Sequence, residues 1–142
     1  MSDSSLQAKG NAIYYDTTTD LSAAIGKLVT FTAGTPAVNA STTTPATGIV
    51  LDARTRTVLS TTRFDNALGI LGALPGPVRA IISAGSAALA FGDTLMQAAD
   101  GTLTKDAGPG TARVVVGVLS DLNGAQAGDF AEVTLFTPQI RS

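Results

Sequence analysis

A pattern of short apolar segments behind glycines occurs twice in this chain of 142 residues, and it restricts the fold more than any other feature of the sequence. The first copy begins at residues 26–29 and the second at residues 92–95. Each copy continues through a Gly-containing turn and a Pro-containing stretch of small residues. Each then returns as an apolar segment behind Gly48 or Gly117. The duplication predicts one arrangement of short strands that is built twice.

The last strands of the two copies are predicted at residues 78–82 and 131–136, which are rich in β-forming residues. The copies differ mainly at residues 53–68, where the first carries an insertion with arginines. An insertion between matching strands belongs at the surface, where binding residues are often found. We therefore expect repeat-like halves over about 26–82 and 92–136.

The residue types favour strands over helices. Glu132 is the only glutamate and lysine occurs three times, whereas both are common on exposed helix faces. Threonine, valine and isoleucine, which favour strands, are frequent, and there are 15 glycines. We predict an all-β chain with little helix, folded as a small β-sandwich or β-barrel of short strands.

The length fits a single domain. We expect a flexible polar arm over residues 1–12 and one β domain over residues 13–142. Within that domain, residues 33–47 have the composition of a long surface loop. The N-terminal residues lack the basic and apolar regions of a signal peptide, and no apolar run reaches the ~20 residues that span a bilayer.

The sequence offers little for chemistry. Cysteine and histidine are absent, which excludes a thiol nucleophile and every Ser-His triad. No serine lies in a Gly-x-Ser-x-Gly motif, and the run from Asp100 to Asp106 lacks the ligand spacing of an EF-hand loop. We predict no enzymatic activity and no catalytic, cofactor or metal site. The net charge of -2 also disfavours nucleic-acid binding.

Four segments carry a family resemblance, and they follow in order along the second half of the chain. They are residues 84–95, Asp100 with Gly101, residues 116–118 and residues 128–133. Their pattern of small residues and strands resembles that of the capsid decoration (cement) proteins of tailed bacteriophages. The resemblance implies a β-rich protein that binds the outside of an expanded icosahedral head and reinforces it. It implies the major capsid protein and further copies of this chain as partners, a homotrimer being favoured and a dimer possible.

The candidate capsid contacts lie in two places. In some decoration proteins the N-terminal arm becomes ordered on the capsid, and here the arm residues are Ser2, Asp3 and Leu6. The second place is the basic cluster of Arg54, Arg56 and Arg63 in the insertion. Arg54 and Arg56 project from the same face of a strand. They form either a solvated outer face or a docking patch for an acidic protein surface.

The expected location is the outer surface of a virion, after synthesis in the host bacterial cytoplasm, with no membrane partner. One alternative remains structural, namely a base module of a tail, a spike or a head fibre. Another is a β-barrel domain that binds a peptide or a sugar. The low aromatic content of 5% counts against sugar binding, which commonly uses a stacked aromatic ring.

Overall fold

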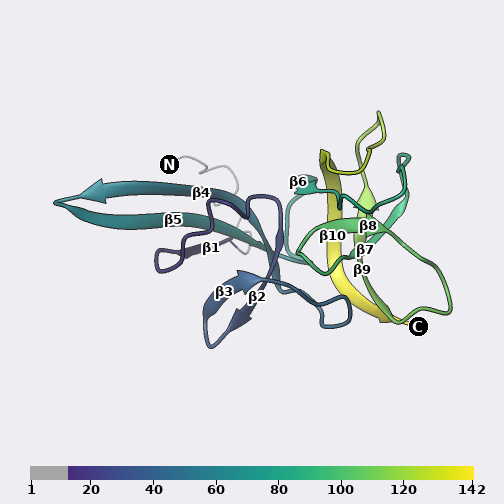
Figure 1. Cartoon of the computed structure of the whole chain (residues 1–142), viewed down its shortest axis with the longest axis horizontal. Coiled ribbons are helices and arrows are strands. Elements are labelled where there is room, and N and C mark those ends of the chain that lie inside the picture. Colours follow the sequence, from purple (N-terminus) through teal and green to yellow (C-terminus); the bar gives the residue numbers. More distant parts are fainter. Residues whose placement is uncertain (1–12) are drawn as a thin grey trace.

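The computed structural model describes residues 13–142, and it confirms the predicted all-β class. These residues form ten strands and no helix, so this range has no helical segment that is long and apolar enough to cross a membrane. The strands lie in two five-stranded antiparallel sheets that stand next to each other (Figure 1).

The two sheets have the same topology. In spatial order the first sheet consists of β1 (Ile13–Asp16), β5 (Thr61–Ile70), β4 (Gly48–Val58), β2 (Leu28–Thr32) and β3 (Thr35–Val38). The second consists of β6 (Val78–Ile81), β10 (Phe130–Arg141), β9 (Arg113–Leu119), β7 (Thr94–Gln97) and β8 (Leu103–Lys105). The second order is the first with every strand number raised by five. The repeat that begins at β2 and β7 is therefore a repeat of strand pairing.

Individual hydrogen bonds repeat as well. The amide of Gly26 donates to the carbonyl of Val50 at 2.9 Å, and the amide of Gly92 donates to the carbonyl of Leu119 at 2.8 Å. Both glycines have positive φ angles, 85° and 88°. This left-handed conformation is accessible to glycine at little cost, which explains why the same residue stands before β2 and before β7.

The closing strands differ from the prediction. The sequence predicts residues 78–82 and 131–136 as matching last strands of the two copies, but β6 and β10 pair directly in one sheet, with Val78 opposite Val133. The topological counterpart of β10 is β5, and that of β6 is β1. β3 also lies inside residues 33–47, which were expected to form a loop. Proline at position 36 is compatible with β3 because this strand lies at the edge of its sheet.

The two halves share one large apolar core, and a second, smaller cluster belongs to the first half. The large cluster contains Leu28, Ala46, Ile49 and Leu71 from the first half and Ala80, Ile82, Leu89, Leu95, Leu103, Val114, Val116, Leu119, Ala125, Ala131, Val133 and Leu135 from the second. The smaller cluster contains Leu21, Ala24, Val29, Val50 and Leu68. Most members of the large cluster therefore belong to the second half.

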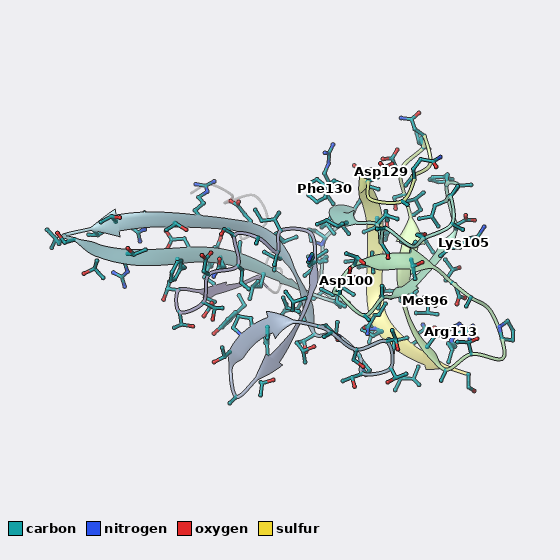
Figure 2. All side chains as sticks on the ribbon, in the orientation of Figure 1. Met96, Asp100, Lys105, Arg113, Asp129 and Phe130 are labelled. Carbon is teal, nitrogen blue, oxygen red and sulfur yellow. The ribbon has the colours of Figure 1, made fainter. Side chains whose placement is uncertain are left out.

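Polar contacts connect the halves at a region that we call the joint. The amide of Leu28 in β2 donates to the carbonyl of Gly101, in the turn between β7 and β8, at 2.8 Å. The amide of Ile81 in β6 donates to the carbonyl of Gly26 at 3.0 Å. In Figure 2 the neighbouring Asp100 lies on the side of the second sheet that faces the first. The β7–β8 turn of the second half thus docks on the beginning of β2.

An ion pair between Arg113 and Asp106 connects the start of β9 with the loop before it. The Arg113 side chain is buried, its Nε donates to Asp106 Oδ1, and its Nη1 donates to the carbonyl of Thr111 at 3.2 Å. Burial alone would raise the pKa of Asp106, but hydrogen bonds from Arg113 and Gly108 outweigh it and hold the pKa below its usual value. The carboxylate is therefore ionised at neutral pH.

Candidate functional site

The β4–β5 hairpin extends beyond the rest of the molecule (Figure 1). β1 follows β5 only as far as the pair of Asp16 and Asn66, and β2 pairs only with the first two residues of β4. Residues 54–65 pair only with one another among the described residues. At ~3.4 Å per residue, residues 54–58 alone extend about 17 Å from this base. The insertion that the sequence singled out therefore forms a projecting arm, which we call the β4–β5 arm.

The β4–β5 arm forms strands because it is rich in threonine, a β-branched residue. Successive side chains point to opposite faces of a strand, so the register assigns each residue to a face. The charged face holds Asp52, Arg54, Arg56, Arg63 and Asp65, and the opposite face holds Thr55, Thr57, Thr62 and Phe64.

Two arginines of the charged face are held by neighbouring aspartates. The Nε atom of Arg54 lies 3.1 Å from Asp52 Oδ2, and the Nε atom of Arg56 lies 2.6 Å from Asp65 Oδ2. All four residues are solvent-exposed to a considerable extent, and exposed pairs of this kind contribute about 0–1 kcal/mol to stability. Their main effect is to orient the guanidinium groups along the β4–β5 arm.

Arg63 makes no ion pair within residues 13–142. It lies directly opposite Arg56 in the ladder, and like charges in that position destabilise a strand pair. The charged face holds three arginines and two aspartates, so it carries a net positive charge. A carboxylate on another surface could pair with Arg63 and offset its repulsion with Arg56, which makes an acidic partner favourable.

The tip of the β4–β5 arm is a two-residue turn with an unusual sequence. Leu59 and Ser60 have φ angles of 51° and 66°, as a type I′ turn requires. Asn-Gly is the favoured sequence in this turn, and a non-glycine residue in the left-handed region costs about 1–2 kcal/mol. The Leu59 side chain is 95% exposed and packs into neither core. Sequence reasoning missed this tip because no Asn, Asp or Gly marks the turn.

A polar network fixes the base of the β4–β5 arm. The carboxylate of Asp16 accepts hydrogen bonds from the amides of Thr18 and Thr19 at 3.3 and 3.1 Å, and from Asn66 Nδ2 at 3.3 Å. Asn66 Nδ2 also donates to the carbonyl of Thr19. Because both Asp16 and Asn66 are buried, this network ties β5 to β1 and to the loop that follows it.

The Asp16 carboxylate is the charged member of that network. Burial alone would raise its pKa, but the hydrogen bonds from Thr18, Asn66 and Thr19 outweigh burial and place the pKa below its usual value. Asp16 is therefore ionised at neutral pH, and hydrogen bonds to an ionised acceptor are stronger than neutral ones. The β4–β5 arm rises from a base that is fixed by charge-assisted hydrogen bonds.

The sequence-predicted contact residues fall into two groups. Ser2, Asp3 and Leu6 lie outside the described residues. Arg54, Arg56 and Arg63 share one face of the β4–β5 arm. The structure thus brings the basic cluster together, while the role of these arginines as capsid contacts stays a prediction.

Aspartates elsewhere serve the turns in which they lie. Asp93 Oδ2 accepts from the amide of Ala90 at 2.9 Å, and Asp100 Oδ1 accepts from the amide of Thr102 at 3.2 Å. Over residues 13–142 no group of three or more His, Cys, Asp or Glu side chains could hold a metal ion.

No family model matches the sequence, and no curated protein or solved structure shows significant similarity to the chain.

Proposed function

We propose that this protein is a structural component of a bacteriophage virion, a capsid decoration protein that binds the outer surface of the head shell and stabilises it. It is made in the host bacterial cytoplasm and joins the assembled head. Its partners are the major capsid protein and other copies of this chain, with a homotrimer favoured. It carries out no catalysis.

The observation that carries this proposal is the β4–β5 arm. Residues 54–65 cover no part of either core, yet they keep an ordered ladder, a net positive face and an exposed leucine in a strained turn. A segment that contributes so little to its own fold is well suited to contact another molecule. An arm about 17 Å long is also able to reach from one shell subunit onto its neighbour.

A decoration protein can bind a shell stably even when each of its contacts is weak. A shell presents its binding site many times, so each copy needs only modest affinity if it contacts two neighbouring subunits at once. The proposed shell site has an acidic rim, which faces Arg56 and Arg63, and an apolar pocket, which receives Leu59. Low charge, 14% of residues, limits repulsion between adjacent copies on the shell.

The direct experiment measures co-sedimentation of the purified full chain with expanded heads that lack their decoration protein. We expect saturable binding that weakens as salt is raised from about 0.1 M to 1 M, because the Debye length falls from about 10 to 3 Å over that range. Heads that bind no wild-type protein at saturating concentration would refute the proposal.

A turn variant tests the part played by the β4–β5 arm. In Leu59→Asn with Ser60→Gly, the tip takes the favoured sequence for a type I′ turn while its apolar side chain is removed. We expect the hairpin to be stabilised and head binding to weaken roughly 10- to 100-fold, the range that burial of one leucine provides. Ser60→Gly alone keeps Leu59 and is expected to bind like the wild type.

Charge variants test the basic cluster. Arg56→Gln with Arg63→Gln should weaken head binding and reduce its salt dependence, since both groups face the proposed acidic rim. Arg141→Gln is the control: it removes one positive charge near the C-terminus, away from the β4–β5 arm (Figure 1). Equal binding by all three proteins would reject an electrostatic role.

Electron cryo-microscopy of the native particle decides the location, and density for this chain in the tail alone would favour the tail-module alternative.

A further inference from the structure

Both edges of the β4–β5 arm are open along residues 54–65. β1 covers the outer edge of β5 only as far as Asn66, and β2 covers that of β4 only at its first two residues. Beyond these strands the arm is a ladder of two strands that projects from the molecule (Figure 1). A two-stranded ladder is marginally stable in water, and a third strand commonly stabilises it. The outer edges of the arm are therefore places where a further strand can pair.

The register of the arm shows which backbone groups face outward. In an antiparallel pair, residues that exchange hydrogen bonds alternate with residues that do not. The type I′ turn closes on the bonded pair of Val58 and Thr61, so the next pair, Thr57 and Thr62, exchanges none. The amide and carbonyl of Thr62, and by the same alternation those of Phe64, point away from β4. Within residues 13–142 no strand lies beside them on that side.

The two open edges differ in shape. Leu51 of β4 has no partner in the ladder, because Val50 lies opposite Leu68 and Asp52 lies opposite Ala67. A bulge of this kind at the foot of an edge twists the strand and disfavours further pairing there. β5 pairs with β1 without any irregularity. A strand beside residues 61–65 therefore extends a row of pairing that β1 has already begun.

The two edges also differ in charge. On β4, the Nε atom of Arg54 already lies 3.1 Å from Asp52 Oδ2. On β5, Arg63 makes no ion pair within residues 13–142 and lies opposite Arg56. A residue of an added strand directly beside Arg63 lies on the same face, with its Cβ atom about 4.5–5.5 Å away. A carboxylate there pairs with Arg63 and offsets its repulsion with Arg56, so the β5 edge favours an acidic strand.

The other face of the β5 edge selects different side chains. Thr62 and Phe64 lie on the face opposite Arg63. Aromatic and β-branched residues stabilise one another as direct cross-strand neighbours. The open row is also short, since the place opposite Asn66 is occupied by Asp16. The edge thus fits a short extended segment in which an acidic residue stands between two β-branched or aromatic residues.

We infer that an extended segment of the shell protein adds as a third strand to the β5 edge of the β4–β5 arm, an inference that rests on the proposed function. Its acidic residue lies beside Arg63, and its two flanking residues lie beside Thr62 and Phe64. In strand addition of this kind, the main-chain hydrogen bonds provide affinity and the alternate side chains provide specificity. The ordered ladder of the arm and its open edge then serve the same contact.

A matched pair of proline variants tests this mode by co-sedimentation with expanded heads that lack their decoration protein. Thr62→Pro removes an outward N–H group of β5, and Thr57→Pro removes the group directly opposite, on the outer edge of β4. Proline is tolerated in an edge strand where its nitrogen faces solvent, so both variants should keep the hairpin, which circular dichroism checks. We expect head binding to weaken roughly 10- to 100-fold in Thr62→Pro, because an acceptor of the added strand loses its donor. Thr57→Pro should bind within about twofold of the wild type.

Hydrogen exchange resolved to single amides gives a second readout on the wild-type chain. When the chain binds heads, the amides of Thr62 and Phe64 should exchange more slowly, while those of Thr55 and Thr57 keep their rates. Equal affinity of the two proline variants, or equal slowing on both edges, overturns the inference and leaves the proposed function standing. Heads that bind no wild-type protein overturn both, so the two failures are distinguishable.

Discussion

Gln97 offers the sharpest test of how the two halves are held together. It is the last residue of β7, and only 1% of it is exposed. Its Oε1 accepts a hydrogen bond from the amide of Ala46 at 2.7 Å. Its Nε2 donates to the carbonyl of Thr44 at 2.8 Å and to that of Ser41 at 3.2 Å. One side chain of the second half thus satisfies three backbone groups in the loop between β3 and β4.

The magnitude follows from which groups lose their partners. Thr44 also accepts a hydrogen bond from Asn39 Nδ2 at 3.1 Å, so its carbonyl keeps a partner without Gln97. The amide of the buried residue Ala46 loses its partner when Gln97 is replaced. A buried unsatisfied donor lowers the free energy of unfolding by about 1–3 kcal/mol. The two bonds donated by Nε2 contribute about 0.5–1.5 kcal/mol each. The substitution Gln97→Met keeps the volume and removes all three bonds, so we expect it to lower the free energy of unfolding by about 2–6 kcal/mol.

The assay is equilibrium unfolding in urea, followed by far-UV circular dichroism at pH 7. Gln126→Ala is the matched control, because it truncates an exposed glutamine and should change the free energy of unfolding by less than about 0.5 kcal/mol. The total stability of a domain of this size is typically about 5–15 kcal/mol, so the expected loss is a large fraction of it. If the free energy of unfolding of Gln97→Met lies within about 1 kcal/mol of the wild-type value, the Gln97 hydrogen bonds do not hold the halves together.

Two further predictions concern stability. Gly101→Ala and Gly34→Ala both force alanine to a φ of +83°, but only Gly101→Ala also pushes a Cβ atom against Val38. In urea unfolding we expect the free energy of unfolding to fall by about 1–2 kcal/mol in Gly34→Ala and by at least about 1 kcal/mol more in Gly101→Ala. Equal losses in the two variants would contradict a close contact at the joint. The pKa of Asp106 is lower in the folded chain than its ordinary 3.8, so its contribution to stability is present above that value and is lost as the pH falls through the folded pKa. The urea midpoint of unfolding should therefore fall as the pH is lowered from 5, and it should fall less in Arg113→Met. If Arg113→Met shows the same pH dependence as the wild type, the ion pair with Asp106 is not the cause of the acid sensitivity.

The sequence predicted the fold class because its residue types are consistent. Scarce Glu and Lys, frequent Thr and Val, and glycines before short apolar segments all favour strands. The duplicated starts at Gly26 and Gly92 were also recognisable, since each glycine serves the same backbone conformation. What failed was the pairing of later strands. Alternating β-formers show that a strand exists but not which strand lies beside it, so β6 was assigned to the wrong copy.

The candidate site was predictable in part for a related reason. The insertion was visible because the matching segment of the second copy lacks its arginines. Its form as a projecting ladder was not visible, because that depends on β1 and β2 ending before residue 54. The tip at Leu59 and Ser60 was missed since turn prediction relies on Asn, Asp and Gly. A turn that departs from those residues can be recognised only from its backbone angles.

The unequal division of the apolar core has a consequence for local unfolding. Leu21, Ala24, Val29, Val50 and Leu68 form the only cluster, among the described residues, that belongs to the first half alone. Segments with fewer buried apolar contacts open at lower free energy and exchange their amide hydrogens faster. We therefore expect the amide hydrogens of the first sheet, which carries the β4–β5 arm, to exchange faster than those of the second sheet. A partner that binds the arm would slow hydrogen exchange most in the first sheet, where the unbound chain is least protected.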